Sequence, residues 1–183
     1  MKYIFIALVA LCLAWCSTHT KKPQIQISTG IKVQKEKRRD VQYITIHHTD
    51  GVMEEANKAI KKFNGRHRTV LKNKVSCMGY YVAYHYVIGI NWDVVKTRCE
   101  YEVWNHDPNH NSHSIGIALV GTFYSYEPTE AQYKSLNKLI EDIKTRYDGI
   151  SILAHRGEDE KDPCPWPMFN RYKVEWIKIL SIK

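Results

Sequence analysis

Residues 43–50 read Tyr-Ile-Thr-Ile-His-His-Thr-Asp, a strand pattern that runs directly into a pair of histidines. A second apolar run, residues 150–154, ends in the same way on His155, and Cys164 follows nine residues later. A single histidine at a strand end is more often structural, but two of them with a cysteine supply three donors from separate parts of the chain. A catalytic zinc ion takes three protein ligands and keeps one position open for water. His47, His155 and Cys164 are therefore the candidate ligands of a zinc ion.

The segments around these two strands alternate between strand and helix patterns. Apolar spacing and turn residues predict strands over residues 41–47, 80–90, 94–104, 115–120 and 150–154, and helices over residues 53–64, 129–147 and 171–180. Turns or polar loops are expected over residues 64–78, 91–93, 105–114 and 158–169. Interleaved strands and helices indicate an α/β fold, a single domain with a mixed central β-sheet flanked by helices.

The helix over residues 129–147 has the clearest local signals. Thr129 is a natural N-cap, and Gln132 three residues later completes a capping box. Apolar residues then recur at the spacing of one helix face: Leu136, Leu139, Ile140, Ile143 and Tyr147. Gly149 suits the end of the helix.

The beginning of the chain has the pattern of an export signal. Residues 3–15 are an apolar run of 13 residues without charge, short for a bilayer span and typical of a signal-peptide core. Cys16 ends this run in a context that resembles a bacterial lipobox, although Trp15 replaces the small residue usual before such a cysteine. We expect Cys16 to carry lipid. The alternatives are an uncleaved membrane anchor and ordinary cleavage that releases a soluble secreted protein.

These features divide the chain into three parts. We expect residues 1–16 to be a signal peptide of the lipoprotein type, residues 17–40 a tether and N-terminal arm, and residues 41–183 the folded domain. The protein is then exported, to the periplasm or the outer surface, and is held to a membrane by the lipid on Cys16.

The chain is basic, with a formal net charge of +8. Such a surface favours polyanionic partners, namely acidic cell-wall polymer, anionic lipid head groups or nucleic acid. No nucleic-acid-binding motif is recognisable in the sequence, and an export signal argues against nucleic acid, so none is expected as a partner.

Five cysteines are present, of which Cys12 is removed with the leader and Cys16 is the expected site of the lipid. If Cys164 binds a metal, Cys77 and Cys99 remain. In an oxidising exported compartment they could form a disulfide, and two unpaired buried thiols are nearly as compatible with the sequence. Their spacing does not choose between these states.

Four blocks of the chain, spread from about Val41 to Phe169, resemble the zinc-dependent N-acetylmuramoyl-L-alanine amidases. That family includes amidase-type phage lysozymes and peptidoglycan-recognition proteins. The matching blocks are residues 44–48, residues 84–88, His106 with Asn111 and residues 114–117, and residues 154–165. Each block alone is weak, but four in order across one domain are specific.

The resemblance implies an amidase-like α/β fold and a set of site residues. It supports His47, His155 and Cys164 as zinc ligands and makes Tyr84 and Lys161 the catalytic candidates. Two residues separate Lys161 from Cys164, where the family usually has one, so Lys161 fits less well.

The substrate-binding candidates are His106, Asn111 and His48. For His48 a structural role competes, because a residue next to His47 on a continuing strand points to the opposite face. His85 is expected to be packed, and His110 and His113 to be polar groups of the loop.

The resemblance further implies hydrolysis of the amide between N-acetylmuramic acid and L-alanine, with peptidoglycan or a muropeptide as the partner of a monomeric protein. The alternative is a non-catalytic peptidoglycan-binding module of the same fold. Loss of the cysteine ligand or of the tyrosine generally accompanies loss of activity in this family, and both are present here as Cys164 and Tyr84.

Overall fold

The structure is a computed structural model, and it describes residues 39–156 together with Cys164 and Pro165. The described part contains five strands and two helices: β1 (Tyr43–His48), α2 (Ala56–Thr69), β2 (Tyr86–Ile88), β3 (Val94–Lys96), β4 (Ser114–Leu119), α3 (Glu130–Lys144) and β5 (Ser151–Ala154). The expected leader, Lys161 and the helix expected over residues 171–180 lie outside the described residues. Among the described helices, none is long and apolar enough to cross a membrane.

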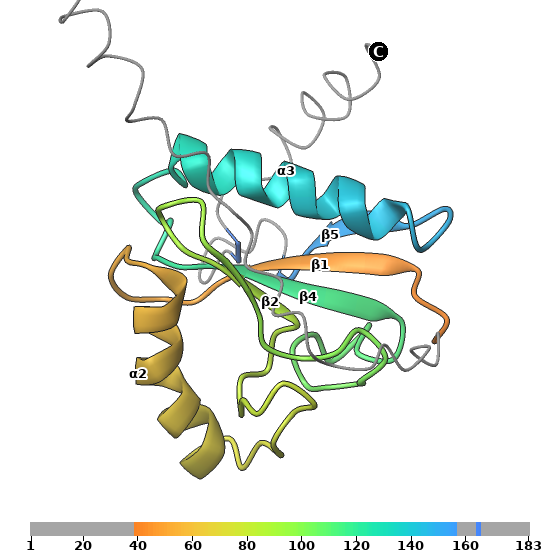
Figure 1. The fold of residues 1–183 in the computed structure, drawn as a ribbon, viewed down its shortest axis with the longest axis horizontal. Helices are drawn as coiled ribbons and strands as arrows, with labels where there is room; N and C mark the ends of the chain where they lie inside the picture. The colour runs from red at the N-terminus through yellow and green to blue at the C-terminus, as the bar shows by residue number, and fades with distance from the viewer. Residues whose placement is uncertain (1–38, 157–163, 166–183) are drawn as a thin grey trace, which may run out of the picture. The chain divides into compact units, whose positions relative to one another are not determined.

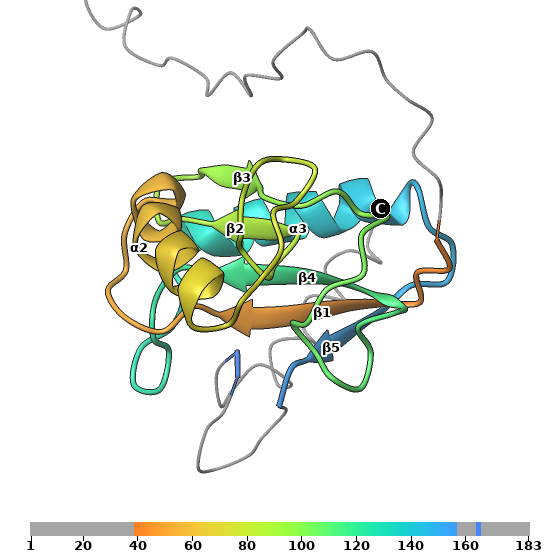
Figure 2. The same ribbon diagram turned by 90° about the horizontal axis from the view of Figure 1, so that it is seen from below.

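The five strands form one mixed sheet, as the sequence predicts, and their order in it is β3-β2-β4-β1-β5 (Figure 2). β1 runs parallel to both β4 and β5, and β2 runs parallel to β4. β3 pairs antiparallel with β2 across the expected turn at residues 91–93. Because β1 and β5 are adjacent and parallel, both strands end at the same edge of the sheet, and there His47 and His155 follow the paired residues Ile46 and Ala154.

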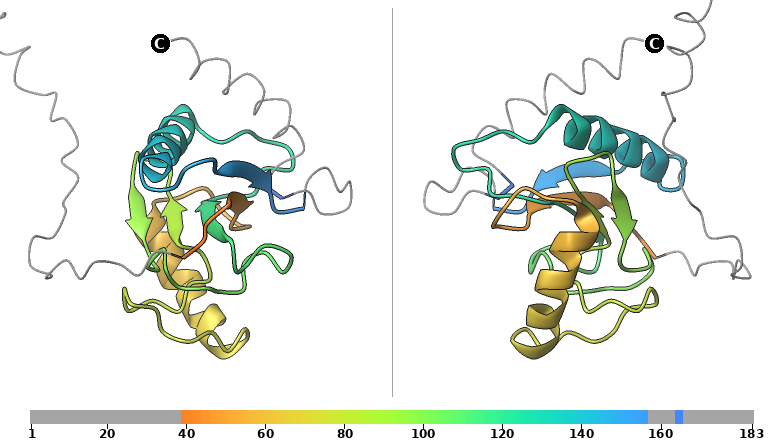
Figure 3. Two further views of the ribbon diagram at one scale, coloured as in Figure 1. Left: turned by 90° about the vertical axis from the view of Figure 1, so that its right-hand side faces the viewer. Right: turned by 60° about the vertical axis from the view of Figure 1, so that its left-hand side comes forward.

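The two helices cover opposite faces of this sheet (Figures 1 and 3). Alternate strand residues point to opposite faces, so each helix has its own apolar core. One core joins α3 to the strands through residues that include Ile44, Ile46 and Leu136. The other core joins α2 to Val87 and Val120. His47 alternates with Ile46, and it therefore lies on the face that α2 covers.

The capping box and apolar stripe expected for α3 are confirmed. The Thr129 hydroxyl accepts the backbone N–H of Gln132 at 3.2 Å, and the Gln132 side chain accepts the N–H of Thr129 at 3.0 Å. The Gln132 amide also donates to the carbonyl oxygen of Val120 at 2.9 Å, which fixes the helix start against the sheet.

The helix α2 differs from the expectation at both ends. It begins at Ala56 rather than near residue 53, and it continues to Thr69, so the loop predicted from residue 64 is wrong as far as Thr69. Its N-cap residue, Glu55, makes no side-chain cap. The Asp93 carboxylate, from the β2–β3 turn, accepts the Ala56 N–H instead.

β2 and β3 are each three residues long, shorter than the strands predicted over residues 80–90 and 94–104. The chain leaves the extended ladder because other contacts satisfy its backbone. Arg98 is completely buried, and its guanidinium donates to the carbonyl oxygen of Val82 at 2.9 Å. Cys77 and Cys99 form a disulfide beside it, which settles the alternative that the sequence left open.

Candidate metal centre

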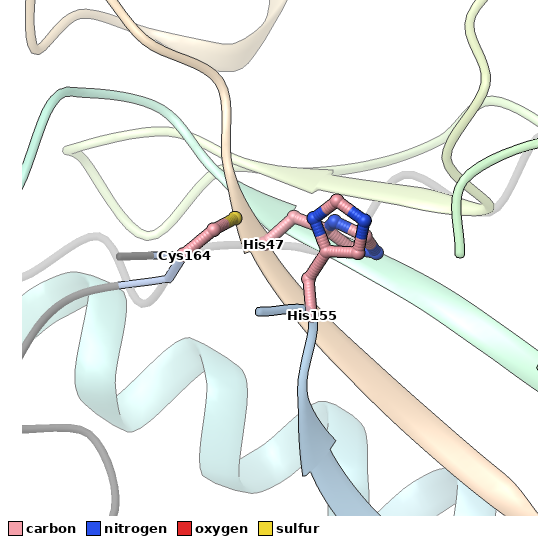
Figure 4. A group of neighbouring side chains, drawn as sticks. All are labelled: His47, His155 and Cys164. Carbon is pink, nitrogen blue, oxygen red and sulfur yellow. The ribbon is translucent and has the colours of Figure 1, made fainter. Parts of the chain in front are cut away.

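Three donor side chains meet at the carboxyl edge of the sheet. The ligand atoms of His47, His155 and Cys164 all lie within 4.8 Å of one another. Figure 4 shows the side chains converging from the end of β1, the residue after β5 and the separate residue Cys164. The backbone N–H of Arg156 donates to the carbonyl oxygen of Cys164 at 3.0 Å, which holds the cysteine beside the strand end. The sequence-predicted ligand set is therefore brought together.

The electrostatics of these groups suit a bound cation. Burial, with smaller effects of the neighbouring histidines, lowers the pKa of His47 well below its ordinary value, so its ring is a neutral donor. Burial raises the pKa of the Cys164 thiol to about 11, although a backbone N–H of His48 partly offsets this. A coordinated cation favours the thiolate strongly. Two neutral imidazoles and one sulfur form a donor set that fits zinc.

His106 lies directly behind His47. Its Nδ1 is 3.1 Å from His47 Nε2, and the ring is 6% exposed. This hydrogen bond occupies Nε2 of His47 and leaves Nδ1 for a cation. The ring rests on Gly116, because a Cβ built there would lie 2.7 Å from His106 Nδ1. Burial lowers the pKa of His106 to about 4, so its ring is neutral near pH 7.

Asn111 shapes the loop that carries His106. Its side-chain oxygen accepts the backbone N–H groups of His106 and Asp107, at 2.9 and 2.8 Å. The oxygen therefore points into the loop, and Asn111 contributes to the site by holding the backbone of His106.

The Tyr84 ring also lies next to His47, and the two ring centres are 5.1 Å apart. It lines the same cleft as the three ligand residues. Burial, then the neighbouring Cys164 and Asp50, raise the pKa of the Tyr84 phenol above its ordinary value. The phenol therefore keeps its proton near neutral pH and is a hydrogen-bond donor. The other catalytic candidate, Lys161, lies outside the described residues.

His48 is buried at the end of β1 and also borders the cleft. Its ring packs edge-on against Phe123 and Tyr124, and its Nδ1 lies 3.2 Å from an Asp50 carboxylate oxygen. Since Phe123 belongs to the core beneath α3, His48 is on the opposite face from His47, as the alternation of a strand predicts.

The remaining histidines of the sequence analysis have structural partners. His85 is completely buried between the backbone N–H of Gly116 and the carbonyl oxygen of Glu102. His110 lies 2.9 Å from the Asp107 carboxylate, in the loop before β4.

The sequence analysis missed His67, which also lines the cleft. It was placed in a loop, but it is a buried residue of α2 whose Nδ1 accepts the Ala83 N–H at 3.2 Å. Burial lowers the pKa of His67 to about 4. Its spacing from Ile60 and Phe63 continues the apolar stripe of α2, and that signal could have found it.

Fold and geometry together define an α/β domain with a two-histidine, one-cysteine candidate metal centre. Residues 37–167 match the family of N-acetylmuramoyl-L-alanine amidases. The chain therefore belongs to that family, as the resemblance of its four blocks implies.

Three relatives illustrate the match. The endolysin of Escherichia phage T7 is 33% identical over 89 residues, which cover 46% of this chain and 58% of that protein. The chain thus spans less than two thirds of this curated relative. Among solved structures, the amidase LysCS of Clostridium intestinale is 24% identical with a TM-score of 0.56, over 79% of this chain and 86% of that one. Drosophila peptidoglycan recognition protein SA is 20% identical with a TM-score of 0.56, over 65% and 69%. These two structures share the fold.

Proposed function

We propose that this protein is a zinc-dependent N-acetylmuramoyl-L-alanine amidase that cleaves the amide between the lactyl group of N-acetylmuramic acid and L-alanine in peptidoglycan. Membership of the amidase family supports the reaction. The observation that carries the proposal is the convergence of the donor atoms of His47, His155 and Cys164 within 4.8 Å.

His47, His155 and Cys164 would hold the ion, and the other residues of the site would prepare it. Bound zinc would supply Lewis acidity and a water whose pKa is lowered to about 7. The hydrogen bond of 3.1 Å from His106 would fix the orientation and tautomer of a metal-bound His47, as residues next to metal ligands commonly do.

Tyr84 would donate a hydrogen bond to the carbonyl oxygen as that oxygen gains negative charge. Its protonated phenol lies beside His47 in the same cleft. A donor aimed at a developing oxyanion typically contributes about 10²–10³ in kcat. Lys161 is our second candidate for such a donor.

The proposal is tested with a defined muropeptide and zinc-loaded protein. We expect release of the stem peptide, seen by mass spectrometry as two products that together gain one water, and loss of this release with a chelator. A protein that binds the muropeptide under zinc-replete conditions and releases nothing would be the alternative, a peptidoglycan-binding module.

The ligand set has its own test, which does not depend on activity. Replacing Cys164 with Ala removes the one sulfur donor, so we expect the purified Cys164→Ala protein to contain far less than one zinc per chain. Metal analysis of Cys164→Ala and of wild type measures this. A Cys164→Ala protein that retains one zinc per chain would remove Cys164 from the site.

We also propose that the protein is exported with a leader of the lipoprotein type, that removal of residues 1–15 makes Cys16 the first residue, that lipid on Cys16 holds the protein to a membrane, and that it acts as a monomer. Mass spectrometry of the mature N-terminus tests the leader and the lipid. An unmodified Ser17 or Thr18 at the N-terminus would contradict lipidation.

A further inference from the structure

Tyr84 lies in a segment that has no regular strand structure, so contacts from elsewhere must hold it. Most of them come from Thr97 and Arg98. The Thr97 hydroxyl donates to the carbonyl oxygen of Tyr84 at 2.7 Å, and the Thr97 N–H donates to that of His85 at 2.9 Å. Arg98 donates to the carbonyl oxygen of Val82 from Nε at 3.2 Å and from Nη2 at 2.9 Å.

Arg98 is itself tightly enclosed. Its guanidinium lies 4.4 Å from the centre of the Trp104 ring and donates to the carbonyl oxygen of Lys74 at 3.3 Å. Its Nη1 is 3.4 Å from the Glu102 carboxylate. The residues that hold the Tyr84 segment therefore also bind the segment that follows α2.

The disulfide joins these same two segments next to Thr97 and Arg98. It links Cys99 to Cys77, and the Glu102 carboxylate accepts the N–H of Cys99 at 3.0 Å and that of Cys77 at 3.3 Å. The hydroxyl of Ser76, the neighbour of Cys77, donates to the carbonyl oxygen of Thr97 at 2.6 Å. Among the described residues, the contacts that would remain between the two segments without the disulfide include these hydrogen bonds.

We propose that the Cys77–Cys99 disulfide positions Tyr84 for catalysis, with Thr97 as the link between the disulfide and the tyrosine. The inference rests on the proposed amidase function. The cysteines and Thr97 are positioning residues, because the cleft is lined by Tyr84 and not by them. The disulfide closes a loop of sequence separation 22 that contains Tyr84, and so it reduces the number of conformations open to the Tyr84 segment.

The first test removes the disulfide in the full-length, zinc-loaded protein with Cys77→Ala and Cys99→Ala together. A catalytic group displaced by about an ångström costs up to about a hundredfold in rate. We therefore expect kcat on a muropeptide to fall by roughly tenfold or more, while KM changes less and zinc content stays at one per chain. A folded, zinc-loaded double variant with wild-type kcat overturns the proposal.

Removing the disulfide in a Tyr84→Phe protein tests whether the loss of kcat depends on the Tyr84 hydroxyl. In a Tyr84→Phe protein the hydroxyl that the disulfide would position is absent. We expect removal of the disulfide in the Tyr84→Phe protein to change kcat by less than about twofold, because the effects of two substitutions on kcat do not add when both act on the same group. If the full loss recurs in the Tyr84→Phe background, the disulfide acts by another route and the proposal fails.

Thr97→Val tests the same link with the disulfide intact, and it remains informative if the double variant does not fold. Valine keeps the shape of threonine and removes the hydroxyl, which donates to the carbonyl oxygen of Tyr84 at 2.7 Å and lies 3.4 Å from that of His85. We expect a several-fold fall in kcat at constant zinc content. Thr145→Val is the matched control, because the Thr145 hydroxyl bonds only within the end of α3, to the carbonyl oxygen of Asp142. Equal kcat for the two variants overturns the link.

A readout without activity separates this inference from the proposed function. In protein labelled with ¹³C at the tyrosine ring, the Tyr84 signal is assigned by its absence from Tyr84→Phe. We expect this signal to shift or broaden in the disulfide variant, with the signal of Tyr126, an exposed residue of the loop before α3, unchanged. An unchanged Tyr84 signal in the disulfide variant overturns the positioning role. If the wild type is inactive but the Tyr84 signal still shifts in the disulfide variant, the result counts against the amidase function alone.

Discussion

At the scale of single residues, the candidate site depends on how closely two neighbours of His47 approach it. The ring centre of Tyr84 is 5.1 Å from that of His47, and His106 is joined to His47 by a hydrogen bond of 3.1 Å. Neither is one of the three ligand residues, so each can be changed with the ligand set intact.

Tyr84→Phe removes the phenol hydroxyl and keeps the ring that packs in the cleft. We expect kcat to fall by about 10²–10³, the usual cost of losing one donor to a developing oxyanion. Zinc content should stay at one per chain, because Tyr84 is not a ligand. Steady-state kinetics on a muropeptide, with metal analysis of the same sample, measures both. Wild-type turnover in the variant would discard the donor role.

Gly116→Ala tests the support behind His47. The added methyl group would lie 2.7 Å from His106 Nδ1, so the ring must move and its hydrogen bond to His47 is lost. Changes behind a metal ligand typically weaken metal affinity by about 10–100-fold, and we expect that loss in a competition titration with a zinc chelator.

Gly65→Ala is the control for that substitution. Gly65 lies in α2 with nothing within 4 Å of the added Cβ, so alanine should leave zinc affinity unchanged and stabilise the helix by about 0.5–1 kcal/mol. Unchanged zinc affinity in Gly116→Ala would show that His106 does not support His47.

At the scale of elements, α3 and the central strands were predictable because their signals are local. The capping box of Thr129 and Gln132 and the alternation along β1 lie within single segments of the sequence. The ends of α2 were not predictable, because its N-terminal cap comes from a turn far along the chain. Asp93 occupies that turn, 37 residues after Ala56.

Asp93→Ala tests this distant cap. The Asp93 carboxylate accepts the N–H of Ala56 and that of Asn91, the latter at 3.0 Å. Alanine at position 93 therefore leaves both N–H groups without this acceptor. We expect a loss of about 0.5–2 kcal/mol in the free energy of unfolding, the usual cost of losing a helix cap, measured by urea denaturation. Asp148→Ala is the matched control, since Asp148 is exposed after α3 and should change stability by less than about 0.5 kcal/mol. Equal losses would show that Asp93 is not the cap.

The residues of the site were likewise predictable only where the signal lies in the nearby sequence. His47 and His155 were predictable because each follows its own strand pattern, and Cys164 because it lies a short distance beyond. A substrate contact by Asn111 stays a prediction, and its side-chain oxygen accepts two backbone N–H groups of its own loop, which the sequence pattern does not indicate. His67 was not predicted as a site residue, because its partner is the backbone N–H of Ala83, which lies 16 residues later in the chain and packs against α2.

At the scale of the whole molecule, Glu100 connects parts of the domain that are distant in sequence. Its carboxylate is 2% exposed, accepts the phenol of Tyr86 in β2, and pairs with Arg146 beyond α3 at 2.8 Å. The Arg39 guanidinium donates to its backbone carbonyl oxygen at 2.6 Å. Glu100 thus joins the sheet to the end of α3 through its carboxylate, and it binds the start of the domain through its backbone.

The same carboxylate should make stability depend on pH. Burial alone would raise the pKa of Glu100, but the hydrogen bonds of Arg146 and Tyr86 and the positive charges of Arg146 and Lys96 outweigh it and hold the pKa below the ordinary value of 4.5. A carboxyl group with a lowered pKa in the folded state stabilises the protein above its unfolded pKa, and this contribution is lost as the pH falls through the folded value. The free energy of unfolding should therefore decrease as the pH falls below about 4.5.

Glu100→Gln isolates this contribution. The variant keeps the shape of the side chain but removes its charge and its titration, so we expect a loss of about 1–3 kcal/mol at pH 7 and a smaller decrease between pH 5 and 3 than wild type shows. Urea denaturation at several pH values measures both effects. Glu141→Gln, on the exposed side of α3, is the control and should follow the wild-type curve. If Glu100→Gln keeps the wild-type dependence on pH, the acid sensitivity of the domain resides in other carboxylates, and Glu100 joins its three partners without titrating in that range.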